Sequence, residues 1–453
     1  MSKVLRYIHI IVLVILLMLP AIGNAGALEE YEEAHKLYLA AAACTAVYSD
    51  RVGSIARDAL EQDGWKIESY VGRSSQVDAR FLVAKKIQPG TTVPFYLLAA
   101  VGTENIKDIK ADLRVGKVYF AGKTPEEFTA NAQRKDMPDS VPKVHEGFNQ
   151  YVQASLAAQV HEEVGNAQKP LLDVLLENKE RKVYLVGHSL GGAGVTLGGA
   201  RLLDMGVRSE QVEVITFGAP AVGNKAFRQR FDPILNVTRV VMKGDPITQV
   251  LQKLVGGYEQ FGQEIRWKAP EGEMSDSHQI TSYLDLAIKN YYQKRQQAVL
   301  TGEFSLANEA VGTAEVPRVY VAQLKNNLPE ELQEEFLYMR EALEDEYRSM
   351  LPGYVLGITD EGKDVFQKAL ALGCKWVVVP EIQAYKIKNE KDCFYITLNQ
   401  GVYRADSGEI LNAASYGSST RNLTSLEALI HDAKTMGHDR HDWLISSQKK
   451  EEQ

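Results

Sequence analysis

The chain has 453 residues, of which 45% are hydrophobic and 24% are charged, and its formal net charge is −8. This length is sufficient for two or three domains, and the composition is typical of a globular protein, which excludes the fibrous and disordered classes. The negative charge argues against nucleic acid as a partner, because nucleic-acid binding requires a basic face, and it disfavours electrostatic docking to an acidic membrane surface.

The N-terminal 25 residues predict an export signal. Lys3 and Arg6 precede an apolar run over residues 10–19, and Gly23-Asn24-Ala25 has the small-x-small form of a signal peptidase site. The apolar run is short for a membrane span, so an uncleaved N-terminal anchor is the less favoured alternative. We therefore expect an exported protein, periplasmic or secreted, with residues 1–25 as its signal peptide.

Residues 26–300 predict an α/β domain. Its expected elements are a helical stretch at 29–61, strands at 81–84 and 94–101, a mostly helical region at 145–178, three β-branched strands at 183–186, 212–217 and 238–242, and a closing helix at 281–298. A helical pattern separates the first two β-branched strands, and this βαβ rhythm indicates a largely parallel sheet with helices on both faces.

A second, smaller α/β domain is expected at residues 317–437. Residues 301–316 lack periodicity and predict a linker, and residues 438–453 form a charged tail. The expected elements of the smaller domain are strands at 318–321, 354–358, 375–379, 382–388 and 394–404, and helices at 330–350, 362–372 and 426–436. Cys374 and Cys393 either pair across strands or remain buried thiols.

Ser189 is the candidate nucleophile. It lies at the centre of Gly187-His-Ser-Leu-Gly191, directly after the apolar strand at 183–186 and before a Gly/Ala-rich helical run. A strand–turn–helix elbow holds such a serine still, because its turn is too tight for side chains at the two glycine positions. The N–H groups at the start of the following helix are suited to stabilising an oxyanion.

A serine nucleophile needs a general base and an acid that orients the base, and in an α/β-hydrolase the acid precedes the histidine along the chain. Of the four histidines after Ser189, only His278 lies within residues 26–300, whereas His431, His438 and His441 lie beyond the linker. A surface-loop histidine remains the alternative interpretation of His278.

Asp245 is the candidate acid, because it follows the strand at 238–242 in a Gly-Asp-Pro turn. Its rivals, Asp232 and Asp276, do not follow a strand, and a simple turn-forming role for Asp245 is the alternative. The second oxyanion donor is expected at Thr103, after the strand at 94–101, with the Leu190 backbone N–H as its partner. A plain turn at Thr103 is the alternative.

These residues resemble the class 3 lipases, the family of the secreted fungal triacylglycerol lipases. The resemblance covers roughly residues 35–295 and includes the elbow, the Gly102-Thr103 pair, and the segments Val144–Phe148 and Val214–Asn224. The resemblance implies an α/β-hydrolase fold. Two positions depart from the family pattern: Val101 stands where the family usually has arginine, and Ile109 stands where an aromatic residue is common.

By this resemblance Ser189 is the nucleophile, His278 the base and Asp245 the acid, while Thr103 and Leu190 form the oxyanion hole. His145 and His188 match motif positions without a triad role, and packing or hydrogen bonding beneath the elbow is expected of them. A lid would be sought between Glu104 and Pro142.

The smaller domain is similar to the small α/β domain of periplasmic and outer-membrane lipoproteins, including the N-terminal part of TolB. The similarity rests on Leu370–Val379 and Val402–Leu411. It implies a cell-envelope protein partner and no chemistry in this domain. The tail segment His438–Asp442 has metal-binding residue types, but a solvated tail is the favoured interpretation, because nothing supplies a defined ligand set.

The sequence therefore predicts an exported serine hydrolase that cleaves the carboxylic esters of acyl lipids, as a triacylglycerol lipase does. It is expected to contact a lipid interface transiently and to need no metal or organic cofactor. The alternatives are a phospholipase A, an esterase acting on soluble esters, and an envelope interaction protein whose hydrolase site is vestigial.

Overall fold

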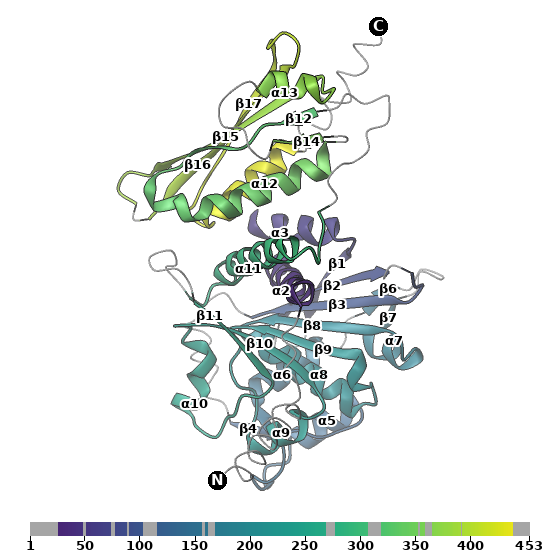
Figure 1. Cartoon of the computed structure of the whole chain (residues 1–453). Coiled ribbons are helices and arrows are strands. Elements are labelled where there is room, and N and C mark those ends of the chain that lie inside the picture. The colour runs from purple at the N-terminus through teal and green to yellow at the C-terminus, as the bar shows by residue number, and fades with distance from the viewer. Residues whose placement is uncertain are drawn as a thin grey trace, which may run out of the picture.

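The structure is a computed structural model of the whole chain (Figure 1). It describes residues 26–48, 51–73, 78–87, 90–102, 116–155, 159–161, 168–268, 277–306, 319–351, 354–357, 365–390 and 392–437. The predicted signal peptide, most of the predicted linker and the charged tail lie outside these residues. Of the helices within the described ranges, none is sufficiently long and apolar to cross a membrane.

Seven strands form one sheet in the order β1-β2-β3-β8-β9-β10-β11. The pairs β1–β2 and β2–β3 are antiparallel, whereas every neighbouring pair from β3 to β11 is parallel. The strands are β1 (Lys66–Arg73), β2 (Asp78–Ile87), β3 (Pro94–Val101), β8 (Lys182–His188), β9 (Val212–Phe217), β10 (Asn236–Met242) and β11 (Gln263–Trp267). A mostly parallel sheet covered by helices confirms the predicted α/β-hydrolase class.

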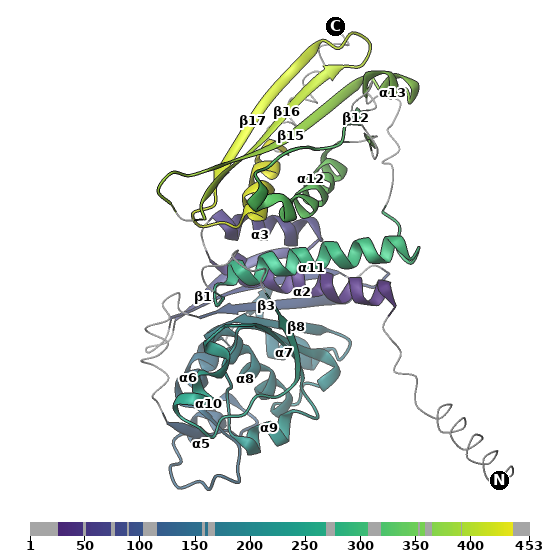
Figure 2. The same cartoon turned by 60° about the vertical axis from the view of Figure 1, so that its left-hand side comes forward.

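Helices cover both faces of this sheet (Figure 2). On β3, Tyr96 and Leu98 pack into one hydrophobic core and Leu97 and Ala99 into the other, because successive side chains of a strand point to opposite faces. One face packs against α5 (Pro125–Ala132), α6 (Glu146–Ser155), α7 (Leu171–Glu177), α8 (Leu190–Asp204), α9 (Lys225–Phe231) and α10 (Val250–Leu254). The other packs against α2 (Ala27–Val47), α3 (Arg51–Gln62) and α11 (Ile280–Leu300).

Two short hairpins and two 3-10 turns complete this unit. The hairpins pair β4 (Lys117–Tyr119) with β5 (Lys143–His145) and β6 (Gln159–His161) with β7 (Gln168–Pro170), and the turns are η1 (Ser209–Gln211) and η2 (Ile247–Gln249).

A second sheet of six strands follows, in the order β14-β12-β15-β16-β17, with β13 paired to β15. Its pairs β15–β16 and β16–β17 are antiparallel, and the other pairs are parallel. Its strands are β12 (Val319–Val321), β13 (Lys325–Asn327), β14 (Tyr354–Leu356), β15 (Trp376–Lys386), β16 (Phe394–Arg404) and β17 (Ile410–Ser419). One face packs against η3 (Glu330–Glu335), α12 (Phe336–Met350) and helical residues 425–437, and the other against α13 (Val365–Ala371).

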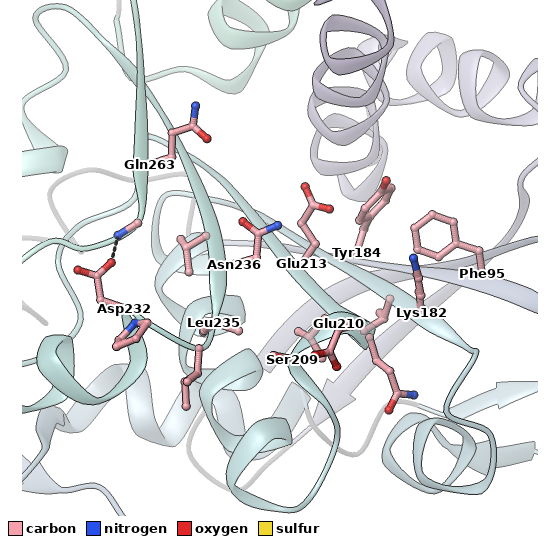
Figure 3. A pocket seen from close by; sticks show the side chains of 17 residues that line it. Phe95, Lys182, Tyr184, Ser209, Glu210, Glu213, Asp232, Leu235, Asn236 and Gln263 are labelled. Carbon is pink, nitrogen blue, oxygen red and sulfur yellow. Dashed lines mark hydrogen bonds between the residues drawn. The ribbon is translucent and has the colours of Figure 1, made fainter. Parts of the chain in front are cut away.

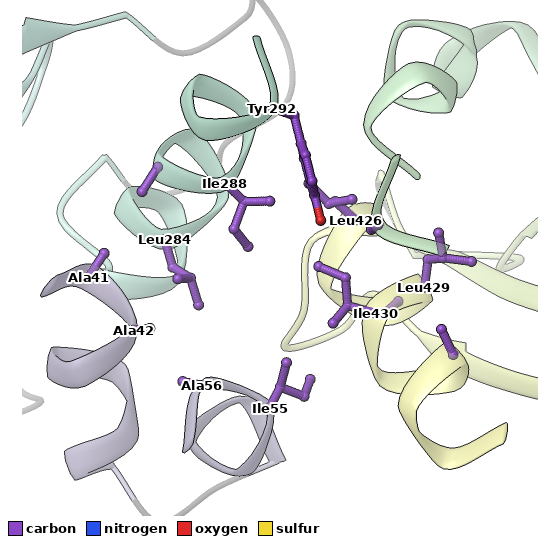
Figure 4. Packing of buried hydrophobic residues seen from close by; sticks show 14 of the residues in the cluster. Ala41, Ala42, Ile55, Ala56, Leu284, Ile288, Tyr292, Leu426, Leu429 and Ile430 are labelled. Atoms are coloured by element: carbon purple, nitrogen blue, oxygen red, sulfur yellow. The ribbon is translucent and has the colours of Figure 1, made fainter. Parts of the chain in front are cut away.

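The two units share one continuous hydrophobic core (Figure 4). On α11, Leu284, Ile288 and Tyr292 face the helix that contains Leu426 and Ile430 in the second unit. The second unit therefore packs on the helical layer α2–α3–α11 of the first, and this layer is buried between the two sheets (Figure 1). The predicted domain boundaries remain predictions, because residues 307–318 lie outside the described part of the chain.

The structure differs from the sequence prediction at several places, and the strands β1, β11 and β13 and the hairpins β4–β5 and β6–β7 were not predicted. The helical stretch at 29–61 is two helices, because the backbone is extended at Tyr48, with φ −73° and ψ 140°. The two strands expected on either side of Pro380 are the single strand β15, since the fixed φ of proline is compatible with extended backbone. The strand β17, whose sequence ILNAASYGSS is rich in small and polar residues, was not predicted.

Cys374 and Cys393 are free, buried thiols. They lie just before the first residues of β15 and β16, and these two strands run antiparallel with Trp376 opposite Arg404 and Lys386 opposite Phe394. The two cysteines thus lie beyond opposite ends of an 11-residue ladder and are more than about 30 Å apart at about 3.3 Å per residue. The alternative of a disulfide between them is wrong.

Candidate active site

The chain turns sharply between β8 and α8, and Ser189 lies at this turn. Its φ of 56° and ψ of −125° place it in a region that residues other than glycine rarely adopt. The Ser189 N–H donates to the carbonyl oxygen of Phe217 on β9 at 3.0 Å, which fixes the turn to the neighbouring strand. The hydroxyl is thereby held at the carboxyl end of a central strand, as in a nucleophile elbow.

The glycines on either side of Ser189 are required by packing. A Cβ on Gly187 would lie 2.6 Å from backbone atoms of Gly191 and Gly192, and a Cβ on Gly191 would lie 2.2 Å from the carbonyl oxygen of Ala100. These neighbours are backbone atoms, which cannot move aside as a flexible side chain can. The G-x-S-x-G spacing therefore follows from how closely β8, α8 and β3 approach one another.

Three side chains that are distant in sequence form a linear array. The Nε2 atom of His278 is 2.9 Å from Ser189 Oγ, and the Nδ1 atom is 2.9 Å from each carboxylate oxygen of Asp245. Since an ionised carboxylate only accepts hydrogen bonds, Nδ1 carries the ring proton and Nε2 is left to accept the serine hydroxyl. This arrangement makes Ser189 able to transfer its proton to His278.

Asp245 follows β10 in a tight turn, and its carboxylate accepts two hydrogen bonds besides that from His278. The backbone N–H of Ile247 donates to Oδ1 at 2.9 Å, and the hydroxyl of Tyr283 donates to Oδ2 at 2.7 Å. The same hydroxyl accepts from the Met242 N–H at 3.0 Å. Burial, reinforced by the adjacent carboxylate, raises the pKa of Tyr283 well above its usual value, so its hydroxyl remains a donor.

His188 forms a hydrogen bond to the backbone of His278, the candidate base. Its Nε2 donates to the carbonyl oxygen of His278 at 2.7 Å, and its Nδ1 lies 3.5 Å from the hydroxyl of Tyr48 at the end of α2. Burial, with a smaller effect from the neighbouring His278, lowers the pKa of His188 to about 3. A neutral ring with one donor and one acceptor matches these contacts, so His188 has the hydrogen-bonding role that the sequence suggested for it.

His145 lies away from this array, on the face of the sheet that carries α6. Its Nδ1 accepts from the Phe148 N–H at 3.4 Å, and the two rings pack at 4.2 Å. It therefore has the packing role that the sequence suggested.

Leu190 is the first residue of α8, so its N–H has no partner within the helix. A Cβ on Gly102, at the end of β3, would lie 2.9 Å from this nitrogen, so the chain passes directly beside the candidate donor. Thr103, the other expected donor, lies outside the described residues.

The rival residues are placed elsewhere. Asp232 precedes β10 rather than following it, and its carboxylate accepts from the Gly262 N–H at 3.0 Å. His431 lies 3.2 Å from the Ser418 hydroxyl in the second unit. Asp276, His438 and His441 lie outside the described residues. Within the described ranges no group of three or more His, Cys, Asp and Glu residues could hold a metal ion, and the tail segment at 438–442 is not among them.

A cavity of about 590 Å³ lies at the end of the sheet that is opposite the end carrying Ser189 (Figure 3). It is lined at the amino ends of β8, β9 and β10 by residues that include Lys182, Glu213 and Asn236. Ser189 follows the carboxyl end of β8, the edge where open α/β sheets bind their ligands. The cavity is therefore separate from the array of Ser189, His278 and Asp245. Ser189 itself is only 1% exposed and His278 4%, so the array is covered in this conformation.

Part of the chain matches a known protein family. The family model described as lipase (class 3) matches residues 97–254, a range that contains Ser189 and Asp245 but ends before His278. The sequence resemblance is thus confirmed for this part of the chain.

Two curated plant proteins and one solved structure are among the similar proteins. The chain is 31% identical to phospholipase A1-Igamma1 of Arabidopsis thaliana over 30% of the chain and 32% of that protein. It is 29% identical to phospholipase A1 EG1 of Oryza sativa over 49% of the chain and 58% of that protein. The triacylglyceride lipase of Rhizomucor miehei is 23% identical, with a TM-score of 0.39 over 52% of this chain and 80% of that one. The chain thus spans less than two thirds of either curated relative.

Proposed function

Since residues 97–254 carry the class 3 lipase pattern, we propose that the chain is a serine hydrolase that cleaves the carboxylic esters of acyl lipids. The observation that carries this proposal is the array Ser189–His278–Asp245, joined by contacts of 2.9 Å. Nucleophile, base and orienting acid each have the partner that their role requires.

In the first half of the reaction Ser189 Oγ attacks the ester carbonyl carbon while its proton moves to His278 Nε2. The charge on the resulting imidazolium is stabilised by Asp245 through Nδ1. When the tetrahedral intermediate collapses, the ester C–O bond breaks, and the leaving alkoxide takes the proton from Nε2. An acyl group then remains on Ser189.

In the second half a water molecule gives its proton to His278 Nε2 and attacks the acyl carbonyl carbon. The bond to Ser189 Oγ breaks, Oγ takes the proton back, and the fatty acid leaves. In both halves the negative charge on the carbonyl oxygen would be stabilised by the Leu190 N–H, and Thr103 is proposed as the second donor. Loss of one such donor typically costs about 10²- to 10³-fold in kcat.

The burial of Ser189 supports a lipid substrate presented at an interface. Because 1% of Ser189 and 4% of His278 are exposed, we propose that part of the surrounding chain moves before an ester reaches Oγ. Such an opening would expose apolar surface of the protein, which is unfavourable in water. At a lipid interface that surface contacts lipid instead of water, so the interface would favour the open form. We therefore expect little hydrolysis of a dispersed ester and a steep rise once the same ester aggregates.

A phospholipase A activity is the second candidate, because the two curated relatives described above are named as phospholipases A1. The chemistry at Ser189 is the same for both candidates, since each substrate has a carboxylic ester. They differ in the headgroup, which must be tolerated next to the site.

The deciding experiment compares substrates under one condition. The purified chain without residues 1–25 is assayed on p-nitrophenyl esters of increasing chain length, then on emulsified triacylglycerol and on phosphatidylcholine vesicles. Ser189→Ala is the control in each assay. Release of fatty acid from triacylglycerol alone supports a lipase, and release from the vesicles supports a phospholipase A. Hydrolysis of short dispersed esters alone would contradict the lipid proposal and favour a soluble-ester esterase.

We also propose that the protein is exported through its N-terminal signal. The supporting observation is the sequence of residues 1–25, with basic residues, an apolar run and a small-x-small site. N-terminal sequencing of protein recovered from cells tests this proposal. A mature chain that begins near Gly26 supports cleavage, and a chain that retains residues 1–25 would contradict it.

A further inference from the structure

The second unit contacts α11, and α11 is the helix that directly follows His278. The helix begins at Ile280, and within its first turn Tyr283 donates to Asp245. The face of α11 that carries Asp285, Lys289 and Arg295 binds the second unit. One helix therefore connects the candidate catalytic array with the second unit.

A buried ionic cluster joins the two units near the start of α11. Lys289 Nζ is 2.9 Å from Asp285 Oδ2, one helical turn earlier, and it also donates to the Glu335 carboxylate at the end of η3. The three side chains are 8%, 2% and 5% exposed, respectively. Because these charges are removed from water, each needs its partners in place, and a change at Glu335 affects the α11 residues directly.

A second contact reaches the same aspartate from the other side. The hydroxyl of Thr424 donates to Asp285 Oδ1 at 2.7 Å. Thr424 is also the cap of helical residues 425–437, since its hydroxyl accepts from the Glu427 N–H and the Glu427 carboxylate accepts from the Thr424 N–H. Asp285 thus accepts hydrogen bonds from Lys289 on α11 and from Thr424, which caps a helix of the second unit.

Further along α11, Arg295 reaches two carboxylates of α12. Its Nη1 lies 2.6 Å from Asp345 and its Nη2 lies 2.6 Å from Glu341. The side chain is 3% exposed. These neighbouring carboxylates, together with the surrounding tyrosines, raise the pKa of Arg295 in spite of its burial, so it stays charged.

We propose that the second unit positions the catalytic array by holding α11, with Asp285, Lys289, Glu335 and Thr424 as positioning residues. This inference rests on the proposed serine hydrolase function. The path is short: Asp285 is two residues from Tyr283, whose hydroxyl fixes the Asp245 carboxylate. If α11 shifts or rotates, both Tyr283 and the backbone that follows His278 shift with it. A displacement of about 1 Å at such a distance can lower the rate on the order of 100-fold.

The test compares variants that loosen the second unit at different places. Glu335→Gln and Thr424→Val remove contacts to α11, and Thr424→Ser restores the hydroxyl. The matched control is Glu346→Gln, which breaks the buried pair of Glu346 with Lys434 at 2.8 Å. Both members of that pair belong to the second unit, so the control weakens the unit without touching α11.

Two measurements are made on each variant of the full chain. The first is kcat and KM for an aggregated p-nitrophenyl ester. The second is hydrogen exchange of the backbone amides of residues 281–288, which needs no activity. For Glu335→Gln and Thr424→Val we expect kcat to fall on the order of tenfold with KM nearly unchanged, and exchange in residues 281–288 to accelerate by a similar factor. Thr424→Ser and Glu346→Gln should match the wild type in both.

The proposal is overturned if Glu335→Gln and Thr424→Val exchange and turn over like the wild type, or if Glu346→Gln loses as much kcat as they do. Faster exchange with unchanged kcat would also overturn it, because α11 would then be held without effect on the site. If the wild type shows no hydrolysis, the proposed function fails, and the exchange measurement still decides whether the second unit holds the start of α11.

Discussion

Replacing Asp245 with asparagine tests how the structure fixes the tautomer of His278. The Asp245 carboxylate accepts from His278 Nδ1, from the Ile247 N–H and from the Tyr283 hydroxyl. In asparagine, one of the two carboxylate oxygens is replaced by an NH2 group, which donates hydrogen bonds, and only the remaining oxygen accepts them. Because Nδ1 is 2.9 Å from both oxygens, the asparagine NH2 also faces the ring and favours the tautomer with its proton on Nε2. In that tautomer His278 cannot accept the proton of Ser189.

The expected loss is large, although the change in shape is small. A serine hydrolase with its histidine in the wrong tautomer loses about 10⁴-fold in kcat, which corresponds to about 5 kcal/mol at 1.36 kcal/mol per tenfold. The free energy of unfolding should fall by only about 1–3 kcal/mol, the typical cost of one impaired buried hydrogen bond. Activity and stability therefore separate in this variant.

The assay measures kcat on an aggregated p-nitrophenyl ester together with urea unfolding. Asp232→Asn is the matched control, because Asp232 lies in the same domain at the other end of β10 and is 39% exposed. We expect the control to stay within about twofold of the wild type, as surface substitutions usually do. A folded Asp245→Asn chain that retains a tenth or more of the wild-type kcat would refute the assignment of Asp245 as the orienting acid.

Three further changes have defined outcomes. Tyr283→Phe removes the donor to Asp245, and urea unfolding should show a loss of about 2–4 kcal/mol, because a buried N–H also loses its acceptor; an unchanged midpoint would contradict this bond. Arg201 is fully buried, donates to the Asn149 side-chain oxygen and lies over the rings of Phe120 and Phe128, so Arg201→Met should lower the unfolding free energy by about 1–3 kcal/mol, because a buried oxygen loses its donor; an unchanged midpoint in urea unfolding would contradict these contacts. The pKa of His188 is about 3 in the folded chain and about 6.5 in the unfolded chain, so between these values only the unfolded chain binds the proton. The free energy of unfolding therefore decreases as the pH falls below 6.5, by up to about 1.4 kcal/mol per pH unit. In His188→Gln the decline of unfolding free energy between pH 6.5 and 4 should be less steep, and equal slopes would count against a neutral buried His188.

The elbow could be predicted from sequence because its causes are local. The turn needs glycine at Gly187 and Gly191, and the flanking strand and helix show their own periodicity, so a short segment contains the whole signal. The order of acid and histidine then selects Asp245 and His278, whose contacts with Ser189 the structure supplies.

The hydrogen bonds around this array could not be predicted, because they join residues that are distant in sequence. Nothing in the sequence near Tyr283 indicates that its hydroxyl reaches a carboxylate 38 residues away. The contact of Thr424 with Asp285 spans 139 residues and depends on how the two units pack. From the sequence, the second unit was predicted to be a separate domain, whereas its hydrophobic core is continuous with that of the first unit. The envelope partner expected for the second unit remains a prediction.

The missed strands have a similar explanation. The strand β17 has Ile410 as its one β-branched residue, and it is held by its ladder with β16. Its glycine at 417 has the ring of Tyr395 across it, where a Cβ would lie 2.6 Å from the ring. Pairing and cross-strand packing, rather than local propensity, form this strand.

The most direct test of the central claim is the mass of the chain after reaction with a fluorophosphonate in the presence of lipid vesicles. This reagent phosphonylates an activated serine, so it reports the nucleophile without any assumption about the substrate. We predict one adduct, located by peptide mass spectrometry on Ser189, absent in Ser189→Ala and strongly slowed in Asp245→Asn. A folded wild-type chain that gains no adduct, or that carries it on another residue, would contradict the assignment of Ser189 as the nucleophile.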